Sequence, residues 1–355
     1  MRISRSLLSV ATALAMLVAP VAGLADRPSP KLERYKDQLD NSIDRALKWL
    51  ATHQRKDGSF PGGYGQTTAI VGLAAMAFLS KGYTPDGEPY GDVINKCIDY
   101  VLRYQSRHRG FGAGPGGGGM YAHGIATLLL SEVSGMVDPE RQEKIDQVLP
   151  KALKVILNAQ ARPKAPKHRG GWRYDAGRAD SDISVTSWQV MALRSARQNG
   201  AQIPKKAIDD AVAYILKCRR PDGGFAYQPG EARGSGAGRT GVGLLCLELT
   251  GHHDTPQTRG AGDYLLRHMG KAAFIKDPHY HYALYYCSQG MFQLGGEYWE
   301  VFAERMYRTT LKQQKADGSW GGGPRPNGRA ADTYSTAATV LALTVSYRQL
   351  PIYQR

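Results

Sequence analysis

The sequence predicts an all-α fold in which six helical hairpins follow one another along the chain. The first observation is a motif, Leu311-Lys-Gln-Gln-Lys-Ala-Asp-Gly-Ser-Trp320, which has weaker copies in the rest of the sequence. The second is that each interval between copies holds one amphipathic and one apolar helical pattern. A period near fifty residues indicates one supersecondary unit copied in series. The aromatic residues that mark the units are Phe60, Phe111, Trp172, Phe225, Phe274 and Trp320.

The first helix of each unit is predicted to be amphipathic. Ala46, Leu47 and Leu50 recur at helical spacing in the first unit, as do Cys97 and Val101 in the second. Equivalent patterns span residues 43–52, 93–104, 148–160, 207–217, 260–269 and 298–313. Because one face of such a helix is polar, we expect these six helices to form an outer layer.

The second helix of each unit is dense in small and apolar residues. An apolar circumference is typical of a helix enclosed by neighbours, and small residues let helices approach closely, so we expect an inner layer. Repeat five is the most divergent, and the other five helices align on one polar position, held by Thr68, His123, Thr186, Thr240 and Thr336. These patterns alone leave open whether the hairpins form an open superhelix or a closed ring.

The segment Gln314-Lys-Ala-Asp-Gly-Ser-Trp320 resembles the glutamine–tryptophan repeat of squalene and terpene cyclases, and is similar to repeats of protein prenyltransferase β-subunits. That superfamily builds an α/α toroid with six inner helices around a central cavity, so the resemblance implies a closed ring. It covers about residues 40–345 and is most specific in repeats one, three and six. Because Asp-Gly favours a tight turn, we interpret the motif as a structural clasp between hairpins.

The first twenty-five residues differ in composition from the rest of the chain. Arg2 and Arg5 precede an apolar run over residues 7–18, and the small residues Ala22 and Ala25 follow it. This order is typical of a secretory signal peptide, with an uncleaved N-terminal anchor as the alternative. We therefore expect residues 1–25 to be a signal peptide, residues 26–355 to form a single toroid domain, and the protein to be periplasmic or secreted.

The chain is strongly basic, with a formal net charge of +15. Such a surplus favours anionic surfaces, for example lipids or polysaccharides. Nucleic acid is not an expected partner of an exported protein. We expect a monomer whose surface is basic and solvated.

Four cysteines are spread widely over the sequence. No pair has the spacing of a cysteine-rich zinc cluster. An exported protein permits a disulfide, but the sequence does not select a pairing, so buried free thiols are the expectation. They are Cys97, Cys218, Cys246 and Cys287.

Candidate catalytic residues stand just before the inner helix of repeat three, in Asp180-Ser-Asp182-Ile183. This segment is similar to the Asp-x-Asp-Asp motif of class II terpene cyclases, whose middle aspartate protonates an alkene or epoxide. The resemblance implies that Asp182 is the acid and Asp180 its neighbouring carboxylate, as paired acids allow. Ile183 stands where the family has its final aspartate, so the partner expected to supply the proton is missing.

A second interpretation makes the same aspartates helix caps. Asp182 and Asp332 both stand four residues before the aligned threonine, and an aspartate at the start of a helix is a favoured N-cap. A third is polar ligand binding at the mouth where the inner helices begin, because helix N-termini attract anions. A carbohydrate-active α/α barrel would need two opposed carboxylates, for which Asp182 and Asp332 are the evident pair.

Aromatic residues also gather on the inner helices. His281 and Tyr285 are four residues apart and share a helix face, and Tyr121 enters from another helix. Aromatic faces hold apolar or cationic ligands, and the resemblance implies such walls around a carbocation. Ordinary helix packing is the alternative. The expected ligand-binding residues are Trp188, His281, Tyr282, Tyr285, Asp332 and Tyr334.

No metal and no cofactor are expected. The prenyltransferase resemblance implies a zinc triad of Asp, Cys and His, but no histidine follows His281, so the triad is incomplete. Asp277, His279 and His281 are an alternative zinc set. A two-residue spacing on a helix splays side chains apart, which argues against this set. The glycine run at residues 114–119 lacks the Lys-Ser/Thr of a phosphate loop.

Two functions remain open on the sequence. The first is an exported relative of squalene cyclases that binds an isoprenoid-like apolar ligand in the central cavity, or cyclises it by acid initiation. As an enzyme it would be terpene cyclase/mutase-like, in the isomerase or lyase class. The second is a non-catalytic extracytoplasmic toroid that binds a protein, glycan or lipid partner. A cavity filled by its own side chains favours the second.

Overall fold

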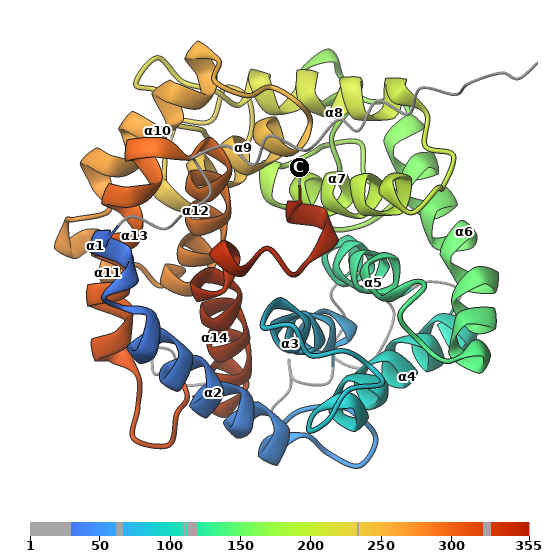
Figure 1. Cartoon of the computed structure of the whole chain (residues 1–355). Helices are drawn as coiled ribbons and strands as arrows, with labels where there is room; N and C mark the ends of the chain where they lie inside the picture. The colour runs from blue at the N-terminus through green and yellow to red at the C-terminus, as the bar shows by residue number, and fades with distance from the viewer. Residues whose placement is uncertain are drawn as a thin grey trace, which may run out of the picture.

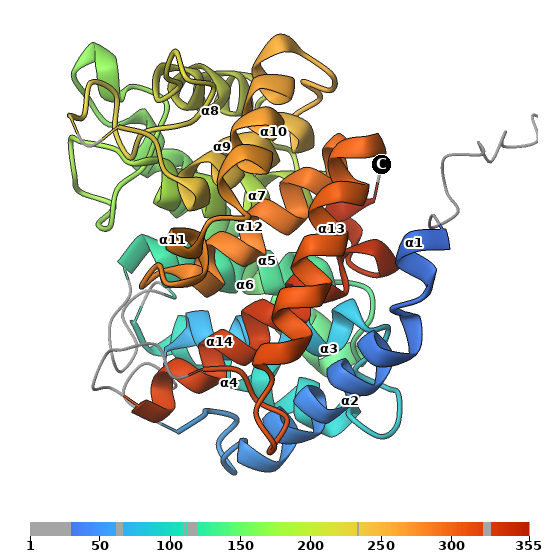
Figure 2. The ribbon, with the colours of Figure 1, turned by 90° about the vertical axis from the view of Figure 1, so that its left-hand side faces the viewer.

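The computed structural model describes residues 30–61, 67–108, 111, 119–232, 234–321 and 328–354, so the predicted signal peptide lies outside the described residues. Over these residues the chain is helical, and its β-structure is limited to two isolated bridges. Six helical hairpins follow one another around a ring, which Figure 1 shows from one side and Figure 2 after a quarter turn. The predicted all-α fold is confirmed.

The inner layer of the ring consists of six helices. Each packs on the next, and the last packs back on the first, which closes the ring. Nearly every residue of the first inner helix is buried, because neighbouring helices enclose it. The closed toroid implied by the resemblance is therefore confirmed. The inner helices are α3 (Thr68–Ser80), α5 (Gly119–Val133), α7 (Ile183–Gln198), α9 (Ala237–Leu249), α12 (Tyr280–Leu294) and α14 (Gly328–Leu343).

The outer layer consists of the amphipathic helices. In the first of them, Leu39, Ile43, Leu47 and Leu50 are buried and recur at helical spacing, while the opposite face is polar. The short helices α1 (Pro30–Glu33) and α11 (Ala272–Ile275) accompany this layer. The outer helices are α2 (Lys36–His53), α4 (Gly91–His108), α6 (Pro139–Ala161), α8 (Lys205–Lys217), α10 (Pro256–His268) and α13 (Gly296–Thr310).

Small residues let inner helices touch through their backbones. A Cβ atom at Gly241 of α9 would lie 2.7 Å from the backbone nitrogen of Cys287 in α12. Any larger side chain would separate these two helices, so the small-residue pattern of the inner layer has a direct structural cause.

The repeated motif joins neighbouring hairpins, and its last copy closes the ring. The Gln314 amide accepts a hydrogen bond from Oγ of Ser42 and donates one to the Ser42 carbonyl, both at 2.8 Å. Gly318 has a φ of +92°, and a Cβ there would lie 2.7 Å from the carbonyl oxygen of Arg45. Gln54 makes the equivalent bond to the Val93 carbonyl of the next outer helix, at 3.0 Å. The predicted clasp between hairpins is confirmed.

The tryptophan anchors Trp172 and Trp320 are each tied to their own hairpin. The Trp320 indole N–H donates to the Thr310 carbonyl at 2.9 Å, and its backbone N–H donates to Oγ1 of Thr336 at 3.0 Å. The backbone N–H of Trp172 donates in the same way to Oγ1 of Thr186, at 3.0 Å. The aligned threonines therefore recur because they hold the anchors.

The C-terminal segment crosses the mouth at which the inner helices end. It contains the short helices η6 (Val345–Tyr347) and η7 (Pro351–Tyr353), and Figure 1 shows it in red over the middle of the ring. Leu350, Ile352 and Tyr353 are buried there. The ring is therefore covered on this side by its own chain.

The remaining sequence expectations concern cysteines and membrane spans. All four cysteines are buried free thiols, as predicted, and burial raises the pKa of Cys97 and of Cys218 to about 12. Among the helices of the described residues, none is long and apolar enough to cross a bilayer.

Candidate functional site

Asp182 lies at the mouth where the inner helices begin, directly before α7. Its Oδ1 atom accepts a hydrogen bond from the Val185 N–H at 2.8 Å, and the side chain is fully buried. An antiparallel bridge fixes the approach to the helix, because the Asp182 N–H donates to the Trp172 carbonyl at 2.8 Å. The predicted N-cap is thus confirmed for Asp182.

Arg173 binds both aspartates of the predicted acid pair. Its Nη1 atom lies 2.8 Å from Oδ2 of Asp182, and its Nε atom lies 3.1 Å from Oδ2 of Asp180. Arg178 also donates to Asp180, at 2.9 Å. The two guanidinium groups lower the pKa of Asp180, whereas burial raises the pKa of Asp182 despite its bonds to Val185 and Arg173.

Two tyrosines complete the surroundings of Arg173. Its Nη1 atom donates to the hydroxyl of Tyr227 at 2.5 Å, and that hydroxyl lies 2.5 Å from the hydroxyl of Tyr174. The guanidinium carbon lies 4.2 Å from the centre of the Tyr174 ring, in cation–π contact. The arginine is therefore held by the loop that precedes α7 and by Tyr227 of repeat four.

Further tyrosines reach the same mouth from other inner helices. The Tyr282 hydroxyl lies 2.6 Å from Oγ of Ser184, and the Tyr121 ring stacks on Tyr174 with centroids 5.8 Å apart. Burial raises the pKa of Tyr121 and of Tyr282 well above 10, with a smaller contribution from the Asp182 charge. We call Tyr121, Tyr174, Tyr227, Tyr282 and Tyr334 the tyrosine cluster, and each keeps part of its surface exposed.

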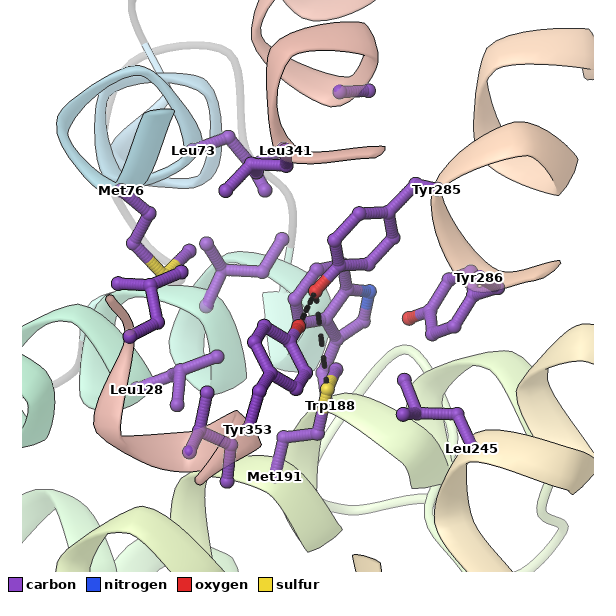
Figure 3. Close-up of a cluster of buried hydrophobic side chains, with 14 of the residues drawn as sticks. Leu73, Met76, Leu128, Trp188, Met191, Leu245, Tyr285, Tyr286, Leu341 and Tyr353 are labelled. Carbon is purple, nitrogen blue, oxygen red and sulfur yellow. Dashed lines mark hydrogen bonds between the residues drawn. The ribbon is translucent and has the colours of Figure 1, made fainter. Parts of the chain in front are cut away.

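Trp188 and Tyr285 lie deeper, in the packed centre of the ring (Figure 3). Their rings stack with centroids 5.6 Å apart and an interplanar angle of 9°. Tyr286 meets Trp188 edge-on and its hydroxyl lies 2.8 Å from Oγ of Ser187. Both side chains are buried in this packing, and their predicted contact with a ligand stays a prediction. Leu73, Met76, Leu128, Met191, Leu245 and Leu341 surround them.

His281 and Asp332 contact different partners. The Nδ1 atom of His281 lies 3.0 Å from Oγ1 of Thr339, and burial lowers the pKa of His281 to about 4. Asp332 lies inside α14, since that helix begins at Gly328, and pairs with Lys315 at 3.0 Å. The predicted N-cap is therefore wrong for Asp332, because α14 starts a full turn before it.

The alternative zinc set is not assembled. Oδ1 of Asp277 accepts a hydrogen bond from the backbone N–H of His279 at 2.7 Å, while His281 turns to Thr339. Within the part of the chain that the structure describes, no three His, Cys, Asp or Glu side chains are grouped to hold a metal ion.

Two cavities bounded by described residues lie away from the predicted site. One of about 550 Å³ lies between α4 and α6, and one of about 540 Å³ lies where α7 and α9 end. None of the catalytic or ligand-binding residues predicted from the sequence lines either cavity.

Sequence reasoning missed Arg173, Tyr174 and Tyr227. A signal for the two tyrosines was present, because each stands two residues after an aromatic anchor, Trp172 or Phe225. No pattern marked Arg173, since its role depends on the bridge that brings residues 172 and 182 together.

Comparisons with known proteins agree with this architecture. The family model described as the prenyltransferase alpha-alpha toroid domain matches residues 11–161, 72–272 and 263–354. A drimenyl diphosphate synthase of Streptomyces showdoensis is 25% identical over 196 residues, which are 55% of this chain and 34% of that protein. The match therefore spans about a third of the length of this curated relative.

Solved structures of two different enzyme classes share the fold. A variant of the type II terpene cyclase MstE from Scytonema, in complex with its substrate geranylgeranyl dihydroxybenzoate, has a TM-score of 0.59 and 16% identity, over 90% of this chain and 99% of that one. An inactive variant of an alpha-1,6-mannanase of Salegentibacter sp. HEL1_6 has a TM-score of 0.62 and 9% identity, over 86% of this chain and 98% of that one. At such identities the likeness concerns the fold alone.

Proposed function

The chain belongs to the prenyltransferase alpha-alpha toroid domain family, and on this premise we propose that it binds an isoprenoid-like apolar ligand. The proposed site is the mouth where the inner helices begin. The observation that carries the proposal is the tyrosine cluster, whose members come from three inner helices and two motif loops and stay partly exposed.

Tyrosines suit such a ligand because they combine an apolar face with a polar edge. The ring faces contact a hydrocarbon chain, while hydroxyls fixed by Ser184 and Arg173 orient its polar end. All six inner helices begin at this mouth, and their N-termini favour a ligand that carries a negative group. The packed aromatic centre beneath the cluster confines the ligand to this side of the ring.

The names of similar proteins support the choice of ligand class. MstE was solved with geranylgeranyl dihydroxybenzoate, and the curated relative is a drimenyl diphosphate synthase. The mannanase shares the fold as closely. The carboxylates that a glycosidase would need are both paired here, Asp182 with Arg173 and Asp332 with Lys315, which favours the isoprenoid alternative.

We propose binding without acid initiation as the principal activity. An acid must hold a proton, but Arg173 and the Val185 N–H occupy both oxygens of Asp182, an arrangement that favours the carboxylate. One observation favours the second candidate, acid-initiated cyclisation: Asp182 is fully buried, and its burial raises its pKa. Asp182→Asn keeps the cap and removes the acid, so turnover of a polyene that survives this change excludes Asp182 as the proton donor.

The binding proposal is tested by titrating the purified protein with farnesol and geranylgeraniol in a calorimeter. We expect micromolar or tighter binding, weakened about tenfold by Tyr282→Ala or Tyr121→Ala, since each change removes a large apolar face. Tyr298→Ala is the matched control, because Tyr298 lies in the outer helix α13 and bonds to Asp263. Equal affinity in all four proteins would exclude the tyrosine cluster as the site.

We further propose that residues 1–25 are an export signal and that the protein acts as a monomer in the periplasm or outside the cell. The support is the order of charged, apolar and small residues at the N-terminus. Mass spectrometry of the protein recovered from its native host is expected to find a chain that starts at Leu24 or Asp26. A chain that retains Met1 would exclude cleavage.

A further inference from the structure

The C-terminal segment is inserted into the ring, not laid on its surface. Ile352 is fully buried, and Leu350 and Tyr353 are 4% and 5% exposed. Because these three apolar side chains are buried, the ring must enclose the segment, and we call the enclosing groups of the ring its seat.

The seat is made of polar groups that point to the backbone of the segment. Oε2 of Glu132 accepts the N–H of Ile352 at 3.1 Å, and Nε2 of Gln293 donates to the carbonyl of Tyr353 at 2.9 Å. Arg194 donates to the carbonyl of Gln354 at 3.2 Å. Glu132 and Gln293 are almost fully buried, and a buried carboxylate without a partner is costly, so these side chains depend on the segment.

The Tyr353 side chain reaches the aromatic centre of the ring. Its hydroxyl lies 2.5 Å from that of Tyr285, whose ring stacks on Trp188 (Figure 3). A cavity of about 10 Å³ remains beside Tyr353, with Gln289 and Leu341 among its lining residues. It has room for about one water molecule, so the segment fits closely.

We propose that Trp188, Tyr285 and Tyr353 form the floor of the proposed ligand site, and that Tyr353 sets the longest chain that the ring accepts. The inference rests on the proposed function, because it assigns the depth of the same site. A ligand that enters at the tyrosine cluster meets Trp188 and Tyr285, and these rings keep their place because Tyr353 supports them from the other mouth. Tyr353 is thus a specificity-determining residue on the opposite side of the ring from the predicted acid.

The test compares Tyr353→Ala with Tyr353→Phe, which keeps the ring and loses only the hydroxyl. Affinities are measured for farnesol, geranylgeraniol and geranylfarnesol, which differ by one isoprene unit each. We expect Tyr353→Ala to gain about tenfold or more for the longest alcohol relative to farnesol, and Tyr353→Phe to keep the wild-type ranking. Tyr353→Leu, which fills part of the space, is the second variant should alanine prevent folding, with a smaller gain. An unchanged ranking in the folded variants overturns the inference.

A second readout separates this inference from the proposed function. Crystals of wild type and Tyr353→Ala are pressurised with xenon, which occupies apolar cavities regardless of the natural ligand. Xenon beside Trp188 in Tyr353→Ala, but not in wild type, supports the role of Tyr353 in the floor. If the wild type also binds none of the alcohols, the proposed function fails while this inference stands. No xenon in the variant overturns the floor.

Discussion

The Nη1 atom of Arg173 lies 2.8 Å from Oδ2 of Asp182, the fully buried aspartate before α7. The same guanidinium binds Asp180 through Nε, so one arginine contacts both carboxylates that resemble a cyclase acid pair. Removal of one partner from an ion pair that includes a buried carboxylate leaves the other charge uncompensated, which destabilises the fold. The pair is therefore first a structural element of the loop that starts α7.

We predict that Asp182→Ala lowers the free energy of unfolding by about 3–5 kcal/mol, because it leaves Arg173 without its buried partner and removes the cap. Asp182→Asn should cost less, since asparagine still accepts the Val185 N–H. Urea unfolding followed by circular dichroism measures both. Asp180→Asn is the control, with an expected loss below about 1 kcal/mol, because Asp180 is partly exposed. Equal losses at the two positions would contradict the assignment.

The fold was accessible from the sequence because its determinants are local and repeated. Gln314, Gly318 and Trp320 recur in weaker form in the earlier repeats, and each holds a hydrogen bond or a close approach that every hairpin needs. Closure of the ring was not contained in the periodicity. It depends on the contact of Gln314 with Ser42, two residues at opposite ends of the chain, and the resemblance supplied it.

Only part of the candidate site could be predicted from the sequence. Asp182 was found because a cap and an acid motif have the same local pattern. Asp332 has that pattern too, but α14 begins earlier, so the same residue type falls inside a helix. The hydroxyl of Tyr353 contacts that of Tyr285, whose ring stacks on Trp188, and no local pattern relates Tyr353 to Trp188.

We predict that substitution of Gly318, in the contact that closes the ring, strongly destabilises the fold. A Cβ at this position would combine a φ of +92° with an approach of 2.7 Å to the Arg45 carbonyl. We expect Gly318→Ala to lower the free energy of unfolding by about 3 kcal/mol or more. Gly135 has a φ of +85° but no atom within 4 Å of its added Cβ, so Gly135→Ala should cost only about 1 kcal/mol. Denaturant titration of both variants tests whether proximity, and not φ alone, decides the loss.

Gln314 should be required for the same closing contact. Gln314→Ala removes its hydrogen bonds to Ser42 and to the Gly318 carbonyl, and we expect a loss of about 1–3 kcal/mol in unfolding free energy. Gln147 on the exposed face of α6 is the control, and Gln147→Ala should remain within about 0.5 kcal/mol of wild type. Hydrogen exchange of α2 amides is expected to rise in Gln314→Ala alone. Unchanged exchange there would show that other contacts close the ring.

Glu132 should make the stability of the seated C-terminal segment depend on pH. Burial raises its pKa from 4.5 to about 7, although Ser195, the Ile352 N–H and the Arg194 charge act against the rise. Between about pH 4.5 and 7 the folded protein thus retains a proton that the unfolded chain has released. The contribution of Glu132 to stability is therefore complete below pH 4.5 and is lost as pH rises to 7 and above, by about 3 kcal/mol in total.

The buried histidines His123 and His281, whose pKa values burial lowers to about 4, act in the opposite direction, because acid must charge them. The measurement is therefore the difference between wild type and Glu132→Gln in urea unfolding at a series of pH values. We expect wild type to lose about 3 kcal/mol relative to Glu132→Gln between pH 4.5 and 7.5, since glutamine does not titrate. The exposed Glu140, changed to glutamine, should leave the wild-type profile intact. A difference that stays constant with pH would mean that the pKa of Glu132 is the same in the folded and unfolded protein, and that its partners compensate fully for its burial.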